Sequence, residues 1–141
     1  MRDIIFRGKR IDNGSWVEGC LIKRKYYDET TYYIGFIEMT SLTKVEVIPE
    51  TVCQYVGITD KNSKKIFEND VVKTKYGRLC QVVWVSSPRY QCWDMIGLES
   101  RHQAPDWRDI WYKYNLEVVG NIYDNPLLKM KVMLRRYGIT E

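Results

Sequence analysis

The stretch Val56–Lys73, VGITDKNSKKIFENDVVK, constrains the fold of this chain more than any other. Two polar runs, one around Asp60 and one around Asn69, carry short side chains that hydrogen-bond to nearby backbone and favour turns. Ile66 and Phe67 interrupt these runs, and burying them would contribute about 1.5 to 3 kcal/mol each. The sequence therefore predicts two tight polar turns that press an apolar pair into a core.

The second turn leads directly into Val71 and Val72, a β-branched pair that favours a strand. Asn69 is the residue expected at positive φ, because asparagine tolerates the left-handed region. Asp70 is expected to accept backbone N–H groups where the strand begins.

The same stretch resembles the signature of the YopX family, a set of small phage and prophage proteins with the pattern Y-T-G-L-K-D-K-N-G-K-E-I-Y-E-G-D-I-V. Residues 1–7 with 16–19 are similar to the family's opening, and residues 117–126 are similar to its close. The three stretches follow in the right order along nearly the whole chain. The matching residues of the signature are Tyr55, Gly57, Ile58, Asp60, Lys61, Asn62, Lys64, Ile66, Phe67, Glu68, Asp70, Val71 and Val72.

The resemblance implies a mainly β protein of phage or prophage origin whose C-terminal part is an SH3-like β-barrel. It implies no particular reaction. Ser63 and Asn69 stand where the family usually has glycine. Because serine tolerates the left-handed region less well than asparagine, the first of the two turns is expected to depart from the family geometry.

The composition fits one domain or two small ones and excludes a membrane-spanning protein. The chain has 141 residues, of which 45% are hydrophobic and 28% charged, as in ordinary globular proteins. Its 11 Tyr and 5 Trp against 3 Phe favour strands first and a binding surface second. The net charge of +4 permits contact with nucleic acid without arguing strongly for it.

The cysteines and the N-terminus indicate a cytoplasmic protein. No apolar run approaches the roughly 20 residues that span a bilayer, and residues 1–7 lack the apolar region of a secretory signal. The cysteines form no C-x-x-C pair, so we expect reduced and mostly buried thiols and no membrane partner. They are Cys20, Cys53, Cys80 and Cys92.

The first 50 residues read as a small β-sheet region. Strands are expected at residues 4–7, 16–22, 31–37 and 44–48, with a charged connection at 23–29. Asn13-Gly14 predicts a type I′ hairpin turn, in which both residues take positive φ. Pro49 ends this region because it cannot donate to a ladder.

Residues 51–141 are expected to form the barrel domain. Strands are predicted at 51–56, 71–74, 78–85, 90–96 and 116–119, with Gly77 left-handed between the second and third. An insertion at about 97–113 includes a short helix that starts near Pro105. A C-terminal helix covers 127–136, starting after Asn125-Pro126. Strand 78–85 is apolar on both faces and should be the most buried. The predicted core residues are Ile66, Phe67, Val72, Val82, Val83, Trp84 and Ile122.

Known catalytic patterns are missing from the sequence. His102 is the single histidine and lies in a Gly/Pro-flanked stretch, and the cysteines lack zinc-site spacing. A calcium loop starting at Asp60 would need a bidentate glutamate where Val71 stands. Glu68 and Asp70 are better explained as capping groups than as a catalytic pair. With no glycine-rich phosphate loop either, we expect no enzyme activity, no cofactor and no metal.

Two basic clusters are candidates for binding. The first either contacts phosphates with ring stacking or keeps exposed turns and edges soluble. The second lies on the C-terminal helix, where it is expected to form the polar face, and the apolar residues of that helix must pack on the protein body or on another copy. The first cluster is Lys61, Lys64, Lys65, Lys73, Lys75, Tyr76 and Arg78, and the second is Lys129, Lys131, Arg135 and Arg136.

The leading interpretation is a non-enzymatic binding or assembly module that self-associates as a homo-oligomer, with a phage or host protein as another partner. The alternative is a nucleic-acid-binding SH3-like barrel. An enzyme of unfamiliar type is the third, and it would need a cleft that converges on Glu68, Asp70 or His102.

Overall fold

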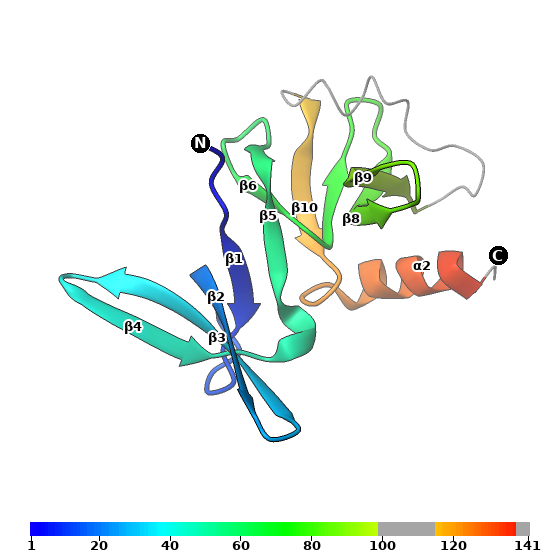
Figure 1. The fold of residues 1–141 in the computed structure, drawn as a ribbon. Coiled ribbons are helices and arrows are strands. Elements are labelled where there is room, and N and C mark those ends of the chain that lie inside the picture. Colours follow the sequence, from blue (N-terminus) through cyan, green and yellow to red (C-terminus); the bar gives the residue numbers. More distant parts are fainter. Residues whose placement is uncertain (99–114, 138–141) are drawn as a thin grey trace. The chain divides into compact units, whose positions relative to one another are not determined.

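The computed structural model describes residues 1–98 and 115–137 and shows a mainly β chain with a C-terminal helix (Figure 1). It divides into two compact units, residues 1–57 and 58–141. The sequence placed the boundary after residue 50, whereas the structural boundary falls inside strand β5, Cys53–Thr59. The insertion and short helix expected within 97–113 lie, beyond Leu98, outside the described residues.

The first unit is an antiparallel sheet. Its strands follow the order β4-β3-β2-β1-β5, and β5 continues past the boundary to neighbour β6 of the second unit. A single 3₁₀ turn, η1, separates β4 from β5. The bounds are β1 Phe6–Lys9, β2 Trp16–Tyr26, β3 Glu29–Glu38, β4 Ser41–Glu46 and η1 Pro49–Thr51.

Strands β2 and β3 form a hairpin that is longer than the sequence predicted. The expected connection at residues 23–29 is wrong, because pairing continues to Tyr26 opposite Glu29. Both faces of this end are exposed, so no apolar alternation marks it in the sequence. Cross-strand pairs hold it instead, including the Lys23 ammonium 5.6 Å from the Tyr32 ring centre.

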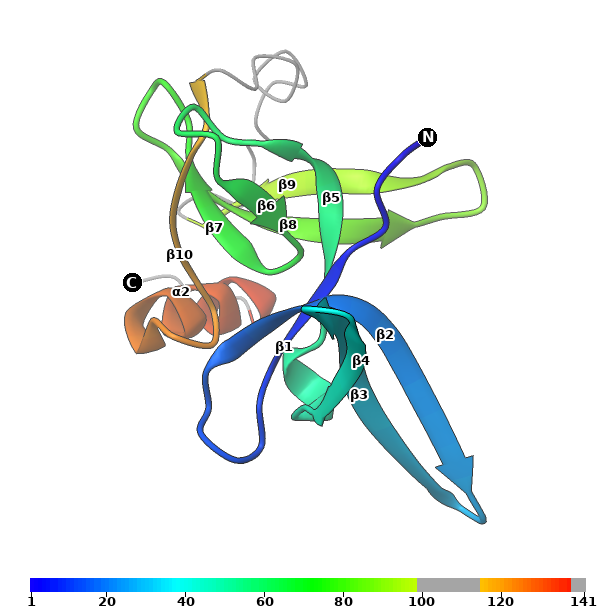
Figure 2. The same cartoon turned by 90° about the vertical axis from the view of Figure 1, so that its left-hand side faces the viewer.

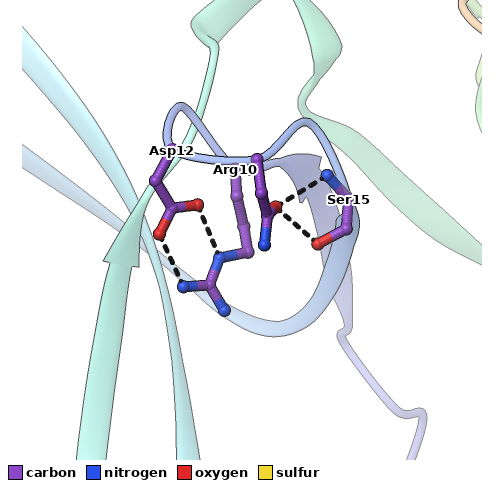
Figure 3. Close-up of polar contacts among 4 residues, drawn as sticks. Arg10, Asp12 and Ser15 are labelled. Carbon is purple, nitrogen blue, oxygen red and sulfur yellow. Dashed lines mark hydrogen bonds and ion pairs between the residues drawn. The ribbon is translucent and has the colours of Figure 1, made fainter.

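The turn between β1 and β2 uses side chains in place of the predicted type I′ geometry (Figure 3). Gly14 has φ 70°, but Asn13 does not share the positive φ. The Asn13 Oδ1 accepts hydrogen bonds from the backbone N (2.9 Å) and Oγ (2.7 Å) of Ser15. Arg10 donates through Nε and Nη2 to the two carboxylate oxygens of Asp12, at 2.9 and 2.7 Å. A longer, side-chain-braced turn therefore joins the strands.

The second unit contains a four-stranded antiparallel sheet, the short strand β6 and the C-terminal helix (Figure 2). The sheet follows the order β10-β7-β8-β9. Strand β6, which the sequence did not predict, neighbours β5 instead of joining this sheet. The bounds are β6 Lys65–Phe67, β7 Asp70–Lys73, β8 Leu79–Ser86, β9 Gln91–Gly97, β10 Glu117–Asn121 and α2 Pro126–Tyr137.

A closed SH3-like barrel is not confirmed. In the described part of the second unit, β10 and β9 are the two edges of the sheet, and their pairing would be needed to close it. The meander β7-β8-β9 matches the expected strand order. What the structure shows is therefore the predicted β class in two antiparallel sheets.

Both faces of β7 and of the first part of β8 are buried. Val72 and Cys80 are paired on one face, and Val71 and Gln81 are paired on the other. All four side chains are fully buried, and Val132 of α2 belongs to the same apolar cluster as Val71. Strand β8 is thus enclosed only where β7 runs beside it, whereas the sequence predicted burial along the whole strand.

Trp84 does not belong to the core, contrary to the prediction. It is 46% exposed and stacks edge to face on Trp93 of β9, with ring centres 5.0 Å apart. Strand β7 pairs only with the first part of β8, Leu79–Gln81, so among the described strands β9 alone pairs with β8 at Trp84. Of the other expected core residues, Ile66, Phe67, Val72 and Val82 are buried, and Val83 and Ile122 are half-buried.

The cysteines divide evenly between the core and the surface. All four are free thiols. Cys53 and Cys80 are buried, whereas Cys20 and Cys92 are exposed, so the expected burial applies to half of them.

Candidate binding surfaces of the second unit

The first polar turn is organised by the Asp60 carboxylate. Its Oδ1 accepts hydrogen bonds from the backbone N of Asn62 (2.8 Å) and of Lys64 (2.9 Å). Its Oδ2 accepts a third from the backbone N of Val118, at 2.9 Å. Because Asp60 is only 6% exposed, this side chain fastens the turn to strand β10 from within.

The environment of Asp60 holds its pKa below the ordinary value. Burial acts alone in the opposite direction and would raise the pKa. The backbone donors and the nearby Lys64 ammonium outweigh burial, because they stabilise the charged form. Asp60 is therefore ionised at neutral pH, and its carboxylate oxygens accept the backbone N–H groups of Asn62, Lys64 and Val118.

Asn69 organises the second turn and connects three elements. Its φ is 66°, as the sequence predicted, and its backbone N donates to the Val82 oxygen at 2.8 Å. Its side chain donates through Nδ2 to the Tyr123 hydroxyl (3.0 Å) and accepts from Gln81 Nε2 through Oδ1 (2.9 Å). The turn is thereby bound to β8 and to the segment that precedes α2.

The two acidic residues beside Asn69 have separate roles. Asp70 is 1% exposed, and its Oδ2 accepts the backbone N–H of Phe67 at 2.9 Å, which confirms the predicted capping of the strand start. Glu68 is half-buried, and burial raises its pKa. The Asp70 carboxylate thus accepts a backbone hydrogen bond, as the Asp60 carboxylate does.

Ser63 occupies the left-handed region, with φ 64°. The expectation that this turn departs from glycine geometry is therefore wrong. The serine keeps that geometry because Asp60 fixes the backbone N–H groups on either side of it. A non-glycine residue at such φ costs about 1 kcal/mol.

Replacing Ser63 with glycine is expected to raise the free energy of unfolding by about 0.5 to 1 kcal/mol, because glycine adopts this φ without strain. Urea denaturation followed by circular dichroism measures the change. Asn69→Gly is the matched control at the second turn. There the loss of the hydrogen bonds to Gln81 and Tyr123 should outweigh the relief of backbone strain, so the free energy of unfolding should fall. Destabilisation by Ser63→Gly would contradict the strained geometry.

The turn between β5 and β6 and the turn between β7 and β8 lie at the same end of the second unit, which we call the basic end (Figure 2). These two turns carry most of the predicted basic residues. Strand β10 brings the two turns together: Leu116 accepts from Lys61 N (2.9 Å), and Glu117 lies opposite Lys73 in the sheet. Glu117 also forms an ion pair with Lys61, at 3.2 Å. The exposed residues of the basic end are Lys61, Lys64, Lys73, Lys75, Tyr76 and Arg78.

The turn between β7 and β8 gives the basic end a fixed backbone. Thr74 is buried, its N donates to Arg78 O at 2.9 Å, and Gly77 has φ 79°, as predicted. The Lys75 ammonium lies 4.8 Å from the centre of the Tyr76 ring, which is on a 67% exposed residue. Lys65, by contrast, is half-buried in β6, so the structure does not group it with the exposed set.

Helix α2 begins at the predicted place. Asn125 precedes it and accepts through Oδ1 from the backbone N of Asn121, at 3.1 Å. The backbone oxygen of Asn125 accepts from Lys129 N at 3.0 Å, and Pro126 occupies the first helical position. This start fixes the direction of α2 relative to the end of β10.

One side of α2 packs on the sheet of its own unit. Leu128 and Val132 join the apolar cluster around Val71. Arg135 does not lie on the polar face as expected: its Nη2 donates to Gln81 Oε1 at 2.8 Å. Burial and then the Arg136 cation lower the pKa of Arg135, which nevertheless stays charged at neutral pH. The local sequence gave no signal for this contact, because the two partners are far apart in the chain.

The opposite side of α2 carries a second apolar stripe, which we call the outward stripe: Pro126, Met130, Met133 and Tyr137. Their spacings of four, three and four residues place them on one side of the helix. Met130 is 52%, Met133 45% and Tyr137 74% exposed. Together with Lys129 and Leu134 they line a shallow groove of about 310 Å³.

Within residues 1–98 and 115–137, no three His, Cys, Asp or Glu side chains form a group that could hold a metal ion. Over the same residues, every helix is too short or too polar to cross a membrane. His102, the single histidine of the sequence, lies outside the described part of the chain.

Comparison with known proteins assigns the family. The crystal structure of protein EF1440 from Enterococcus faecalis is similar over 91% of this chain and 99% of that chain, with a TM-score of 0.52 and 17% identity, and shows a shared fold. No curated protein matches the chain. The family model described as YopX protein matches residues 5–129, which is most of the sequence. The chain therefore belongs to the YopX protein family.

Proposed function

We propose that this chain is a non-enzymatic binding module that assembles with another polypeptide through the outward stripe of α2. The observation that carries the proposal is that α2 is apolar on two opposite sides. Val132 is buried on the inner side, while Met130, Met133 and Tyr137 remain exposed on the outer side. A helix that is apolar on both sides is typical of one covered on both sides.

Physical chemistry supports a protein ligand for this stripe. Fully burying an exposed large apolar side chain contributes about 1.5 to 3 kcal/mol, and covering the exposed parts of Met130, Met133 and Tyr137 would contribute a share of this for each. Methionine side chains are flexible and polarizable, and they are common at surfaces that accept other chains. The expected partner is a protein of the phage or of its host, or a second copy of this chain, in the cytoplasm.

The carboxylates of the signature stretch support the non-enzymatic part of the proposal. Asp60 and Asp70 are buried and accept backbone N–H groups, so both serve the turns. A catalytic acid or base must instead reach a substrate. We therefore propose no reaction and no cofactor.

Site-specific photocrosslinking in the producing cell tests the proposal. A benzophenone amino acid in place of Met133 is expected to give a discrete polypeptide adduct, which Met130→Glu abolishes. The same probe in place of Tyr76, also exposed but at the basic end, is the matched control and should not give that adduct. An adduct at Tyr76 and none at Met133 would contradict the proposal.

Nucleic-acid binding at the basic end is the second candidate function. Lys61, Lys64, Lys73, Lys75 and Arg78 are exposed there, the Lys75 ammonium lies 4.8 Å from the Tyr76 ring centre, and Glu117 is paired with Lys61. Such an arrangement suits phosphate contact with ring stacking.

For this second candidate, the triple variant Lys73→Glu/Lys75→Glu/Arg78→Glu is expected to weaken binding of single-stranded DNA at least about tenfold. The affinity of the wild-type chain should fall steeply with salt. Fluorescence anisotropy with a labelled oligonucleotide measures both effects. Salt-independent binding, or an unchanged affinity of the variant, would refute it.

A further inference from the structure

We infer that the outward stripe binds an amphipathic helix of a different protein, one that carries acidic side chains beside its apolar residues. The inference rests on the proposed function above and specifies its partner. It follows from the spacing of the stripe, from the anchoring of α2 and from the charges at the border of the stripe.

The spacing of the stripe fits a helical partner. Pro126, Met130, Met133 and Tyr137 alternate by four and three residues, which is the repeat of the seam between two packed helices. In this repeat each seam side chain inserts between side chains of the facing helix. The groove of about 310 Å³ along the stripe is lined almost entirely by apolar surface, which the stripe residues, Lys129 and Leu134 provide.

The inner side of α2 holds the stripe in a fixed orientation. Arg135 donates to Gln81 Oε1 at 2.8 Å and to the Ile96 oxygen at 3.3 Å, while Val132 is fully packed. Gln81 in turn donates to Asn69. The helix therefore cannot rotate its exposed apolar side inward without breaking these contacts, and a partner meets a preorganised surface.

The charges beside the stripe select the partner. Lys129 and Arg136 are exposed and occupy the positions that flank a seam of Met130 and Met133. Residues 126–137 contain no acidic residue at all. Flanking charges set partner choice in paired helices, so a partner with glutamate or aspartate at the facing positions is favoured.

The same charges disfavour a second copy of α2. In an antiparallel pair of identical helices, Lys129 of one copy would face Arg136 of the other, which is repulsive. In a parallel pair, Lys129 would face Leu134, which offers no charge. A homodimer through this stripe thus lacks the complementarity that a different, acidic helix supplies.

Labelled synthetic peptides provide the test. The acidic peptide is helical, with leucines at seam positions and glutamates beside them. The basic peptide has lysines in place of these glutamates, and the scrambled peptide has the acidic composition without the seam. By fluorescence anisotropy, the full chain is expected to bind the acidic peptide at least about tenfold more tightly than either of the others.

Charge reversal should invert this preference. Lys129→Glu/Arg136→Glu is expected to bind the basic peptide more tightly than the acidic one. Met130→Glu should lower the affinity for the acidic peptide at least about tenfold. The three residues are exposed, so circular dichroism should show folded variants. Lys73→Glu/Lys75→Glu, the same charge change at the basic end, should leave peptide binding unchanged.

The other outcomes separate this inference from the proposed function. Equal binding of the acidic and basic peptides overturns the inference that charge selects the partner, but the proposed function, binding of a polypeptide at the stripe, stands. A dimer in analytical ultracentrifugation that Met130→Glu dissociates assigns the stripe to a second copy, which again overturns only the inference. Binding to phosphatidylserine vesicles without peptide binding or dimerisation overturns both, as does the absence of all three interactions.

Discussion

Phe67→Ala is expected to lower the free energy of unfolding of the second unit by about 3 to 5 kcal/mol. Phe67 is 2% exposed and lies beside the equally buried Ile66 between the two polar turns. Truncation would remove a large apolar side chain and leave a cavity, since Asp60 and Asn69 hold the turns on both sides in place. Urea denaturation monitored by tryptophan fluorescence measures the loss.

Tyr76→Ala is the matched aromatic truncation. Tyr76 is 67% exposed on the neighbouring turn, so its removal should change stability by no more than about 0.5 kcal/mol. Similar urea midpoints for Phe67→Ala and Tyr76→Ala would show that burial of Ile66 and Phe67 does not stabilise the second unit.

Asp60→Asn is expected to cost about 2 to 4 kcal/mol at pH 7, although the side chain keeps its size. The amide has one acceptor oxygen where the carboxylate has two, so its NH₂ would face a backbone N–H of Lys64 or Val118. Thermal denaturation measures the cost. Asp12→Asn, at an exposed carboxylate in the first unit, should have little effect and serves as the control.

The cost of Asp60→Asn should shrink in acid. The pKa of Asp60 is lower in the folded chain, so its contribution is present above the ordinary aspartate pKa and is lost as the pH falls through the folded value. Burial raises the pKa of Glu68, so its effect on stability changes with pH in the opposite sense. Glu68 is present in both the wild type and Asp60→Asn, so its effect cancels when their free energies of unfolding are subtracted. A difference that stays constant from pH 7 to about pH 3 would contradict the assigned role.

Local patterns predicted much of the second unit. The burial of Ile66 and Phe67, the positive φ of Asn69 and Gly77, and the start of α2 each depend on a few adjacent residues. Turn chemistry and apolar runs are properties of short segments, so the sequence displays them directly.

Features that depend on distant partners were not predictable. Gln81 is fully buried because Asn69 and Arg135 satisfy its amide, and both of these residues lie outside strand β8. Trp84 looked like a core residue because its strand is apolar on both faces, but β7 ends before reaching it. Closure of a barrel likewise depends on which strand edges meet.

The same distinction applies to the candidate surfaces. The sequence identified the basic residues on the turns of the second unit, and the structure leaves all of them except Lys65 exposed. It did not reveal the outward stripe as a separate surface, because the apolar residues of α2 alone do not say which of them face the sheet. Only the contacts of Val132 and Arg135 establish which side remains exposed.

We propose that this protein binds its partner through the outward stripe of α2. The most direct measurement is a titration of the labelled full chain with the acidic helical peptide, followed residue by residue through amide NMR signals. We predict that the largest shifts occur at Met130, Met133 and Tyr137. Shifts confined to the turn at Lys73–Arg78, or a spectrum that the peptide leaves unchanged, would contradict the claim.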